Sequence, residues 1–593
     1  MNENSGSMTT GITPPISLAF PESGDVERTV LLKESMEPYG VFDTGDELNH
    51  RMAVLSRLNV LVKEWIKEVS LEKNMPLNLA ETVGGNVYTF GSYRLGVHNR
   101  GADIDALCVA PRHILREDYF SSFVDKLRAQ PEVSELRSVP EAFVPVIKMN
   151  FDGIEIDMTF ARLALKEVTD NQTLGDPILL KNLDPKCVRS LNGCRVTDEI
   201  LNQVPNKDTF RLTLRGIKLW AKRHGIYSNV LGYLGGVSWA MLVARVCQLY
   251  PNADASQLIQ KFFLVFSNWQ WPQPVLLKKP EDVGLGFPVW DPRLNVSDRF
   301  HHMPIITPAY PQQNSTFNVS RSTLEIMKAE FKSSRQICDD LVVGRVNWDK
   351  LFETPNFFAK YRHFIVLEAS SSSEEDQLEW YGLVESKVRH LVGNLERESI
   401  ELAHVWPKTY PSQVKGQEKT CCYWFIGLII KNVVEQNHLD LTTPIRNFTD
   451  IVMRSAHTIK MWKDGMKVEA CYKRRKQLAK YLPPNERYKL KSERKSLPSS
   501  LTNSPAANHD ESSRDSVKKR VVSSSEAENS NLNDEQGTVD DTEDATGVTN
   551  NENDSNSKDI SSSPSTEDKN VVQPPLKRTK TSEIELRNGL QIS

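Results

Sequence analysis

The stretch FGSYRLGVHNRGADIDALCV (90–109) places a glycine-serine turn before a short apolar strand that carries two aspartates, Asp103 and Asp105. The strand period of two puts both carboxylates on one face, with Ile104 and Ala106 on the other. At about 4 Å and an effective dielectric of about 20, two like charges repel by about 4 kcal/mol. A bound cation, a protonated partner or exposure to water must offset that repulsion.

A third carboxylate lies in VPVIKMNFDGIEIDMTFA (144–161), where Asp152-Gly153 is the dipeptide typical of a two-residue type I′ hairpin turn. That turn predicts that Lys148 faces Asp157. One face of the hairpin is then apolar and the other polar, and a one-residue slip would mix the two sets. The apolar face holds Ile147, Met149, Phe151, Ile154, Ile156 and Met158, and the polar face holds Lys148, Asn150, Glu155 and Asp157.

The polar face of this hairpin predicts a neighbouring strand of the same kind, and the strand with Asp103 and Asp105 supplies one. Three carboxylates on adjacent strands, with no surplus of nearby cysteine or histidine, favour Mg²⁺ or Mn²⁺ over zinc. Two such ions about 3.5–4 Å apart would turn the repulsion into coordination. The alternative is that the acidic side chains simply face solvent. Beside such a site, the turn Phe90-Gly91-Ser92 could hold phosphate oxygens with its backbone N–H groups and the serine hydroxyl.

Length and composition predict a soluble protein with several domains. The chain has 593 residues, of which 39% are hydrophobic and 25% charged, and its net charge is −4. The eight cysteines are scattered, which argues against a secreted disulfide scaffold. The N-terminus shows no signal stretch and no apolar run reaches membrane-spanning length, so we expect no membrane association.

Hydrophobic periodicity predicts helices over 50–74 and 209–226, with short strands between them. A later αβ block begins with a strand at 361–369, continues through an acidic loop (370–376) and a helix, and reaches another strand at 423–430. We expect a region with the candidate site at 1–205, a middle region at 206–354, a third folded block at 355–495, and a tail at 496–593.

The tail is rich in Ser, Asn, Asp and Glu and lacks aromatic residues, so it is predicted to be disordered. It contains two basic clusters, VKKRVV (517–522) and PPLKRTK (574–580), which are typical either of nuclear-import signals or of a solvated charge run. Just before the tail, the basic segment 471–495 is interpreted as a helix and extension that contacts phosphates.

A basic stripe follows one face of the helix predicted at 209–226. It consists of Arg211, Arg215, Lys218 and Lys222, at spacings of four, three and four. The stripe could face a triphosphate and an RNA backbone. It could equally be a solvated helix face beside the apolar stripe.

Several stretches together resemble eukaryotic nuclear poly(A) polymerases, in the nucleotidyltransferase superfamily that includes DNA polymerase β. Besides the glycine-serine turn followed by D-x-D, they are GITPPISLA (11–19), IEIDMTFARLA (154–164), SLNGCRVTDEIL (190–201), KLWAKRHGIYSNVLGYLGGVSWAML (218–242), NWQWPQPVLL (268–277) and GLVESKVRHLV (382–392). The resemblance implies an α+β multidomain fold. Its parts are a nucleotidyltransferase palm with a mixed sheet, a helical middle domain and an RNA-recognition-like αβ C-terminal domain. The third block lacks an aromatic-rich motif for base stacking.

The resemblance also implies a site, residue by residue. Asp103, Asp105 and Asp157 are the expected catalytic and metal-binding residues. The ATP pocket comprises these three together with Phe90, Gly91, Ser92, Lys218, Tyr227, Gly236 and Val237. Further nucleotide or RNA contacts are expected at Lys148, Asn192 and Asn229.

The implied activity is that of a template-independent polynucleotide adenylyltransferase that adds AMP from ATP to the 3′-hydroxyl of pre-mRNA and releases pyrophosphate. Two Mg²⁺ or Mn²⁺ ions are the expected cofactors. Cleavage and polyadenylation factors are the expected protein partners, and we expect a nuclear protein that is monomeric outside their complex. Two alternatives stay open: a terminal transferase of another base preference, and a catalytically silent RNA-binding scaffold.

Overall fold

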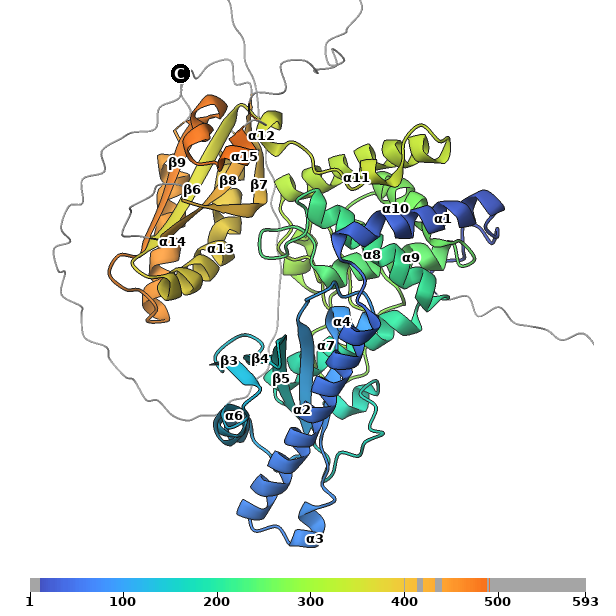
Figure 1. The fold of residues 1–593 in the computed structure, drawn as a ribbon, viewed down its shortest axis with the longest axis vertical. Helices are drawn as coiled ribbons and strands as arrows, with labels where there is room; N and C mark the ends of the chain where they lie inside the picture. The colour runs from blue at the N-terminus through green and yellow to red at the C-terminus, as the bar shows by residue number, and fades with distance from the viewer. Residues whose placement is uncertain (1–10, 399, 413–419, 432–439, 488–489, 491–593) are drawn as a thin grey trace, which may run out of the picture. The chain divides into compact units, whose positions relative to one another are not determined.

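The computed structural model describes residues 11–398, 400–412, 420–431, 440–487 and 490. The predicted tail and its basic clusters lie outside these residues. Within them, no helix is both long and apolar enough to cross a membrane. The fold contains two β-sheets and a group of helices that belongs to neither (Figure 1).

The first sheet has five strands in the order β1-β2-β5-β4-β3. Its strands are β1 (Asn86–Thr89), β2 (Ile104–Ala110), β3 (Val133–Val139), β4 (Val146–Phe151) and β5 (Ile154–Arg162). β2 runs parallel to β5, whereas the other pairs are antiparallel, so the sheet is mixed, as predicted. The elements around it are α2 (Gly45–Glu72), α3 (Leu77–Ala80), α4 (Gly91–Leu95), α5 (Arg116–Asp118), η2 (Tyr119–Phe123), α6 (Val124–Arg128), η3 (Pro177–Leu180) and α7 (Pro185–Asn202).

The hairpin of β4 and β5 has the predicted register. Lys148 is paired with Asp157, and Phe151 with Ile154. Asp152 and Gly153 both have positive φ, 50° and 82°, as a type I′ turn requires. The six predicted apolar side chains of the hairpin are all buried in one cluster with the buried stripe of α2. Alternation of apolar and polar residues, together with the Asp152-Gly153 turn, therefore specified this register.

The opposite face of the sheet is covered by α7. Leu107 and Val109 of β2 and Ala161 of β5 pack there with Leu191 of α7. Asp105 and Asp157 belong to this same face by the strand period, since Asp105 is two residues before Leu107 and Asp157 is four residues before Ala161. The carboxylates therefore lie at the end of a packed face.

The helical group carries the predicted apolar stripe of α8, whose members Phe210, Leu214, Ile217 and Ala221 are all buried. Its helices are α1 (Ser23–Met36), α8 (Lys207–Arg223), α9 (Gly236–Leu249), α10 (Ala255–Asn268) and α11 (Arg321–Val342), with the short turns η1 (Glu37–Tyr39), η4 (Val296–Phe300) and η5 (Trp348–Lys350). This group is the helical middle part that the resemblance implied.

The second sheet has the order β7-β8-β6-β9, and all its pairs are antiparallel. Along the chain its elements follow the order βαββαβ, which with this strand order is the RNA-recognition-like arrangement. They are α12 (Phe357–Lys360), β6 (His363–Ser371), α13 (Glu374–Arg397), β7 (Ile400–Pro411), β8 (Thr420–Ile430), α14 (Thr442–Thr458), β9 (Lys467–Arg474), η6 (Arg475–Lys480) and α15 (Pro484–Arg487). The helix predicted from 471 onward is therefore wrong at its start, where β9 pairs with β6 instead.

Both faces of this second sheet are covered. Helices α13 and α14 pack on one face. On the other face, aromatic strand residues such as Trp406 and Phe425 are buried against Phe357 and Phe358 of α12 and Leu478 of η6. Since those rings are already packed, they are not available to stack on RNA bases, in line with the missing aromatic motif.

Candidate active site

Asp105 and Asp157 lie directly opposite each other on the parallel neighbours β2 and β5. Asp103 is exposed and comes just before β2 begins at Ile104. The pKa of Asp105 is raised to about 7, first by burial and then by the nearby charges of Asp103 and Asp157. The three carboxylates are therefore close enough to repel one another, as the sequence predicted.

Two contacts hold these carboxylates in their present positions. Lys148 forms a short ion pair with Asp157 across the hairpin. A β-carbon on Gly91 would lie 2.1 Å from Oδ2 of Asp105, so that carboxylate rests against the bare glycine backbone. As they stand, no three His, Cys, Asp or Glu side chains in the described part of the chain are arranged to hold a metal ion.

The glycine-serine turn is the start of the short helix α4. Phe90 precedes the helix, and Gly91 has a φ of 62°, which a side chain would strain. The Gly91 N–H donates to Oγ1 of Thr197 on α7, at 3.3 Å. The ring of Phe90 lies against Gly193 of the same helix. The turn is thus fixed to α7 with its glycine facing Asp105.

Asn192 lies on α7 next to Gly193. Its side-chain oxygen is buried and has no hydrogen-bond partner in the structure. A buried amide oxygen without a donor is costly, and such groups call for an explanation. A ligand that donates a hydrogen bond would supply one.

Lys218 lies on α8 and is only 6% exposed. Its Nζ donates to the carbonyl oxygen of Val97 at 2.8 Å. Its pKa is lowered to about 7, first by burial and then by Lys222 and Arg215, against the opposing effect of Asp103 and Asp105. Lys218 is thus a buried amine whose protonation depends on the charges of Asp103 and Asp105.

The rest of the basic stripe has mostly structural contacts. Arg215 donates to the carbonyl oxygens of Val41, Gly96 and His98. Arg211 donates to the carbonyl oxygen of Leu95 at 3.1 Å. With Lys218, these side chains bind four successive carbonyls at residues 95–98, from the last residue of α4 into the loop that follows it. Lys222 is the exposed member of the stripe.

Tyr227 lies beside this stripe, with Nζ of Lys222 5.3 Å from the centre of its ring. Burial and the charges of Asp103 and Asp105 raise the pKa of Tyr227 to about 12. A β-carbon on Gly236, the first residue of α9, would lie 2.8 Å from the Tyr227 hydroxyl. Gly236 therefore allows the close approach of the tyrosine to α9.

The remaining expected contacts lie at the edge of this group. Val237 is 39% exposed at the start of α9. Asn229 donates to the carbonyl oxygen of Ser315 at 3.2 Å and accepts from Asn318 at 3.0 Å. The side chain of Asn229 is thus held by the segment at 315–318.

One cluster of buried charged residues was missed by the sequence reasoning. Arg51 of α2 donates to Oδ2 of Asp43 and to the carbonyl oxygen of Ala102, the residue before Asp103. His98 also contacts Oδ2 of Asp43, at 2.7 Å. The sequence did contain an indication of this cluster, because Arg51 falls at helical spacing on the apolar stripe of its helix. A charged residue in that position indicates a buried partner.

Three family profiles match successive parts of this chain. They are the "Poly(A) polymerase nucleotidyltransferase domain" over 11–204, the "Poly(A) polymerase central domain" over 209–354 and the "Poly(A) polymerase predicted RNA binding domain" over 356–420 and 411–492. Together they account for the two sheets and the helical group.

Curated relatives agree with these profiles. The chain is 43% identical over 498 residues to the poly(A) polymerase of Dictyostelium discoideum, covering 82% of this chain and 61% of that protein. It is 42% identical over 478 residues to nuclear poly(A) polymerase 1 of Arabidopsis thaliana, covering 80% of this chain and 66% of that protein. The chain thus spans 61% to 66% of the length of these two relatives.

Among solved structures, that of the Cid1 poly(U) polymerase is 16% identical with a TM-score of 0.39, over 56% of this chain and 100% of that chain. The match to three successive domain profiles and to relatives above 40% identity is far more specific. The chain belongs to the poly(A) polymerase family, within the polymerase-β-like nucleotidyltransferase superfamily.

Proposed function

We propose that this chain is a template-independent poly(A) polymerase. It adds AMP from ATP to the 3′-hydroxyl of RNA: a bond forms between the 3′-oxygen and the α-phosphorus, and pyrophosphate leaves. The observation that carries the proposal is the pairing of Asp105 with Asp157 on parallel strands, beside Asp103, in a chain of this family.

Members of this family generally use divalent metal ions and ATP, and the donor set fits such ions. Asp103, Asp105 and Asp157 offer only carboxylate oxygens, the ligands preferred by Mg²⁺ and Mn²⁺. Burial and then the charges of Asp103 and Asp157 raise the pKa of Asp105, and a bound cation would favour its ionised form. When bound, two ions would supply charge neutralisation and a lower pKa for the attacking hydroxyl. To take part, Asp157 would first exchange its ion pair with Lys148.

The proposed ATP pocket combines groups from both sides of these carboxylates. Gly91 and Ser92 offer a close backbone approach to phosphates, and Lys218 offers a buried amine that a nearby triphosphate would hold in its protonated form. Tyr227 offers a ring for adenine, with Gly236 and Val237 beside it. The unpartnered oxygen of Asn192 could accept a hydrogen bond from the nucleotide or the RNA. Lys148 and Asn229 are proposed contacts at the rim.

The wider role follows the names of the relatives. We place the chain in the nucleus, in 3′-end processing of pre-mRNA, because relatives named nuclear poly(A) polymerase match 80% of it. We propose domain boundaries near 206 and 355. The third domain would then bind the RNA backbone. Cleavage and polyadenylation factors are the proposed protein partners, with the chain monomeric outside their complex.

The test is primer extension by the purified full chain with a labelled oligo(A), Mg²⁺ and each of the four nucleoside triphosphates separately. A long ladder with ATP alone supports the proposal. Extension with UTP or CTP instead would keep the transferase chemistry and reject poly(A) synthesis. Binding of the primer without extension by any nucleotide would favour the RNA-binding scaffold.

A further inference from the structure

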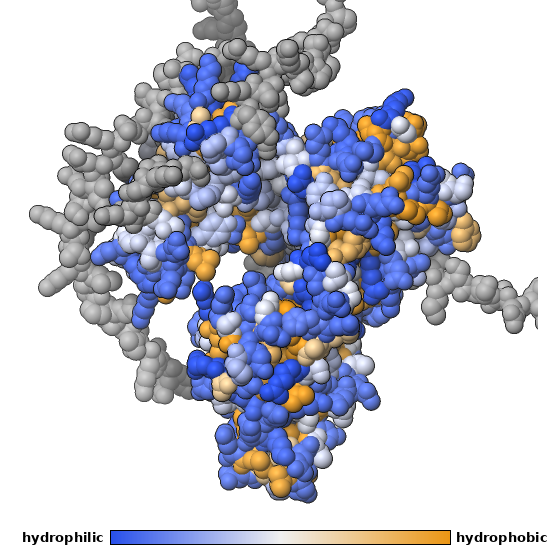
Figure 2. All heavy atoms as spheres, viewed as in Figure 1, coloured by the Kyte–Doolittle hydropathy of each residue, from blue (hydrophilic) through white to orange (hydrophobic). Residues whose placement is uncertain are grey.

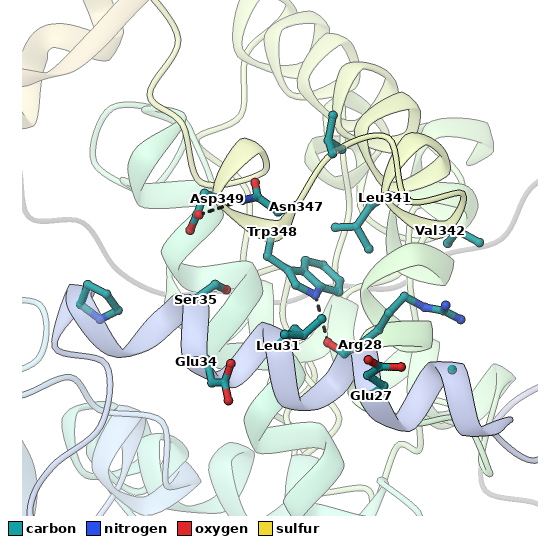
Figure 3. Close-up of a pocket in the computed structure, with 14 residues that line it drawn as sticks. Glu27, Arg28, Leu31, Glu34, Ser35, Leu341, Val342, Asn347, Trp348 and Asp349 are labelled. Carbon is teal, nitrogen blue, oxygen red and sulfur yellow. Dashed lines mark hydrogen bonds between the residues drawn. The ribbon is translucent and has the colours of Figure 1, made fainter.

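A groove lies between α1 and the segment that follows α11, and its volume is about 610 Å³ (Figure 3). None of the residues of the proposed ATP pocket lines it. Its walls come from two distant parts of the chain, residues 24–38 and 341–349. The surface over α1 and the end of α11 is rich in hydrophobic residues (Figure 2).

The centre of the groove is apolar and partly exposed. Leu31 of α1 is 49% exposed and Val342 at the end of α11 is 40% exposed. Trp348 lies between them but is only 4% exposed, so it forms the buried floor of the groove, where its indole N–H donates to the carbonyl oxygen of Arg28 at 3.0 Å. Partly exposed aliphatic side chains around a fixed aromatic ring are typical of a protein-binding groove.

The rim of the groove is acidic. Glu27 and Glu34 lie on either side of Leu31 along α1, and both are exposed. Seven residues make two helical turns, so these carboxylates are about 10 Å apart along the axis. Among the described residues neither glutamate forms an ion pair. Arg28, the cation that lines the groove, is paired with Asp25.

We propose that this groove binds a basic amphipathic helix of a partner protein. The helix would place an aliphatic side chain against Leu31 and Val342, and lysine or arginine side chains seven residues apart against Glu27 and Glu34. Charge complementarity selects a basic partner over an acidic one. We infer a helical partner because helix α1 forms one wall of the groove, and two helices pack with the side-chain ridges of one between the ridges of the other.

The test uses a fluorescein-labelled synthetic peptide of about 18 residues, five helical turns, with leucines on one face and lysines seven residues apart. Fluorescence anisotropy measures its binding to the full chain. We expect Glu27→Lys/Glu34→Lys to raise Kd at least about tenfold and Leu31→Ser to raise it about fivefold. Leu294→Ser is the matched control, because that leucine is 80% exposed outside the groove.

Three further results would overturn the proposal. The first is absence of saturable binding to the unaltered chain, and the second is equal binding of a peptide with glutamates in place of the lysines. The third is a dimer in sedimentation that Leu31→Ser dissociates, since the groove would then receive a second copy of the chain.

Hydrogen exchange should show protection at 24–38 and 341–349 on peptide binding. Primer extension by the same variants should be unchanged, so this test is separate from that of the polymerase activity.

Discussion

At the residue scale, the site is a cluster of like charges without a sufficient counter-charge inside the protein. Asp105 is half-buried, and its pKa is raised to about 7, first by burial and then by the charges of Asp103 and Asp157. Lys148 and Lys218 lower that pKa but do not cancel the increase. The folded state therefore binds a proton at Asp105 more tightly than the unfolded chain does.

This difference predicts that Asp105→Asn stabilises the metal-free protein above pH 7. The unfolded pKa is about 3.9, so ionisation of Asp105 destabilises the fold increasingly from about pH 4 to 7, and fully above. The upper limit of the gain is about 4 kcal/mol, and it should vanish below pH 4. Urea unfolding at several pH values measures it.

Glu155→Gln is the control for this measurement, because Glu155 is an exposed carboxylate on β5, the strand next to that of Asp105. It should change stability by less than about 0.5 kcal/mol at every pH. Equal stability of Asp105→Asn and the unaltered protein at pH 8 would mean that neither burial nor the neighbouring charges destabilise the ionised Asp105 carboxylate.

The contact between Gly91 and Asp105 predicts a second effect. In Gly91→Ala the new β-carbon would push the Asp105 carboxylate away, so AMP addition should fall at least about a hundredfold. Gly153→Ala is the control: Gly153 also has positive φ, but a β-carbon there meets nothing within 4 Å. Primer extension should separate the two variants, and equal losses would show that backbone strain alone is responsible.

At the scale of single elements, α8 acts as a support for the loop that leads to β2. Arg211, Arg215 and Lys218 donate to successive carbonyls at 95–98, and Arg51 of α2 donates to the carbonyl of Ala102. The segment between α4 and Asp103 is thus fixed from two sides. Charged side chains can be retained in such buried positions when they are paired with backbone oxygens.

Arg215→Ala should therefore act on stability. It removes the donor for three backbone carbonyls, and we expect a loss of about 2–4 kcal/mol in the free energy of unfolding. Lys222→Ala, on the same stripe but exposed, should cost less than about 1 kcal/mol. If Arg215 serves only to bind phosphate, urea unfolding will not distinguish these variants, and only ATP affinity will change.

The elements differ in how far the sequence could predict them. The β4–β5 hairpin was predictable to the residue, because strict alternation and the Asp152-Gly153 turn allow one register. The role of Arg215 was not, because its partners Val41 and His98 lie far away in the chain. The second half of β9, from residue 471, was taken for the start of a helix because its basic residues hide the apolar pattern, and its pairing with β6 overrides local preference.

At the scale of the whole described chain, the helical group and the second sheet share a core. One continuous cluster of buried side chains includes residues of α8–α11 and of β6–β8. The Tyr233 hydroxyl donates to the carbonyl of Val405 at 2.7 Å, and the ring of Trp406 covers the bare backbone of Gly225. The sequence predicted two separate blocks here, since no local pattern reports contacts between distant segments.

This shared core predicts that residues 206–487 unfold in one cooperative transition. Gly225→Ala would place a β-carbon 2.3 Å from the Trp406 ring, so it should lower the melting temperature of that transition by several degrees. Gly344→Ala is the control, with a similar φ of 73° and open space around it. Calorimetry that shows the C-terminal sheet melting separately in Gly225→Ala, with the helical group unaffected, would contradict a common core.

We propose that Asp103, Asp105 and Asp157 together catalyse transfer of AMP to RNA. The most direct measurement is the rate of a single AMP addition to a labelled oligo(A) by Asp157→Asn and by Glu155→Gln, two residues apart on β5. We predict a loss of at least about a hundredfold for Asp157→Asn with its fold intact, and a rate near that of the unaltered protein for Glu155→Gln. Equal rates for the two variants would contradict the assignment of the site.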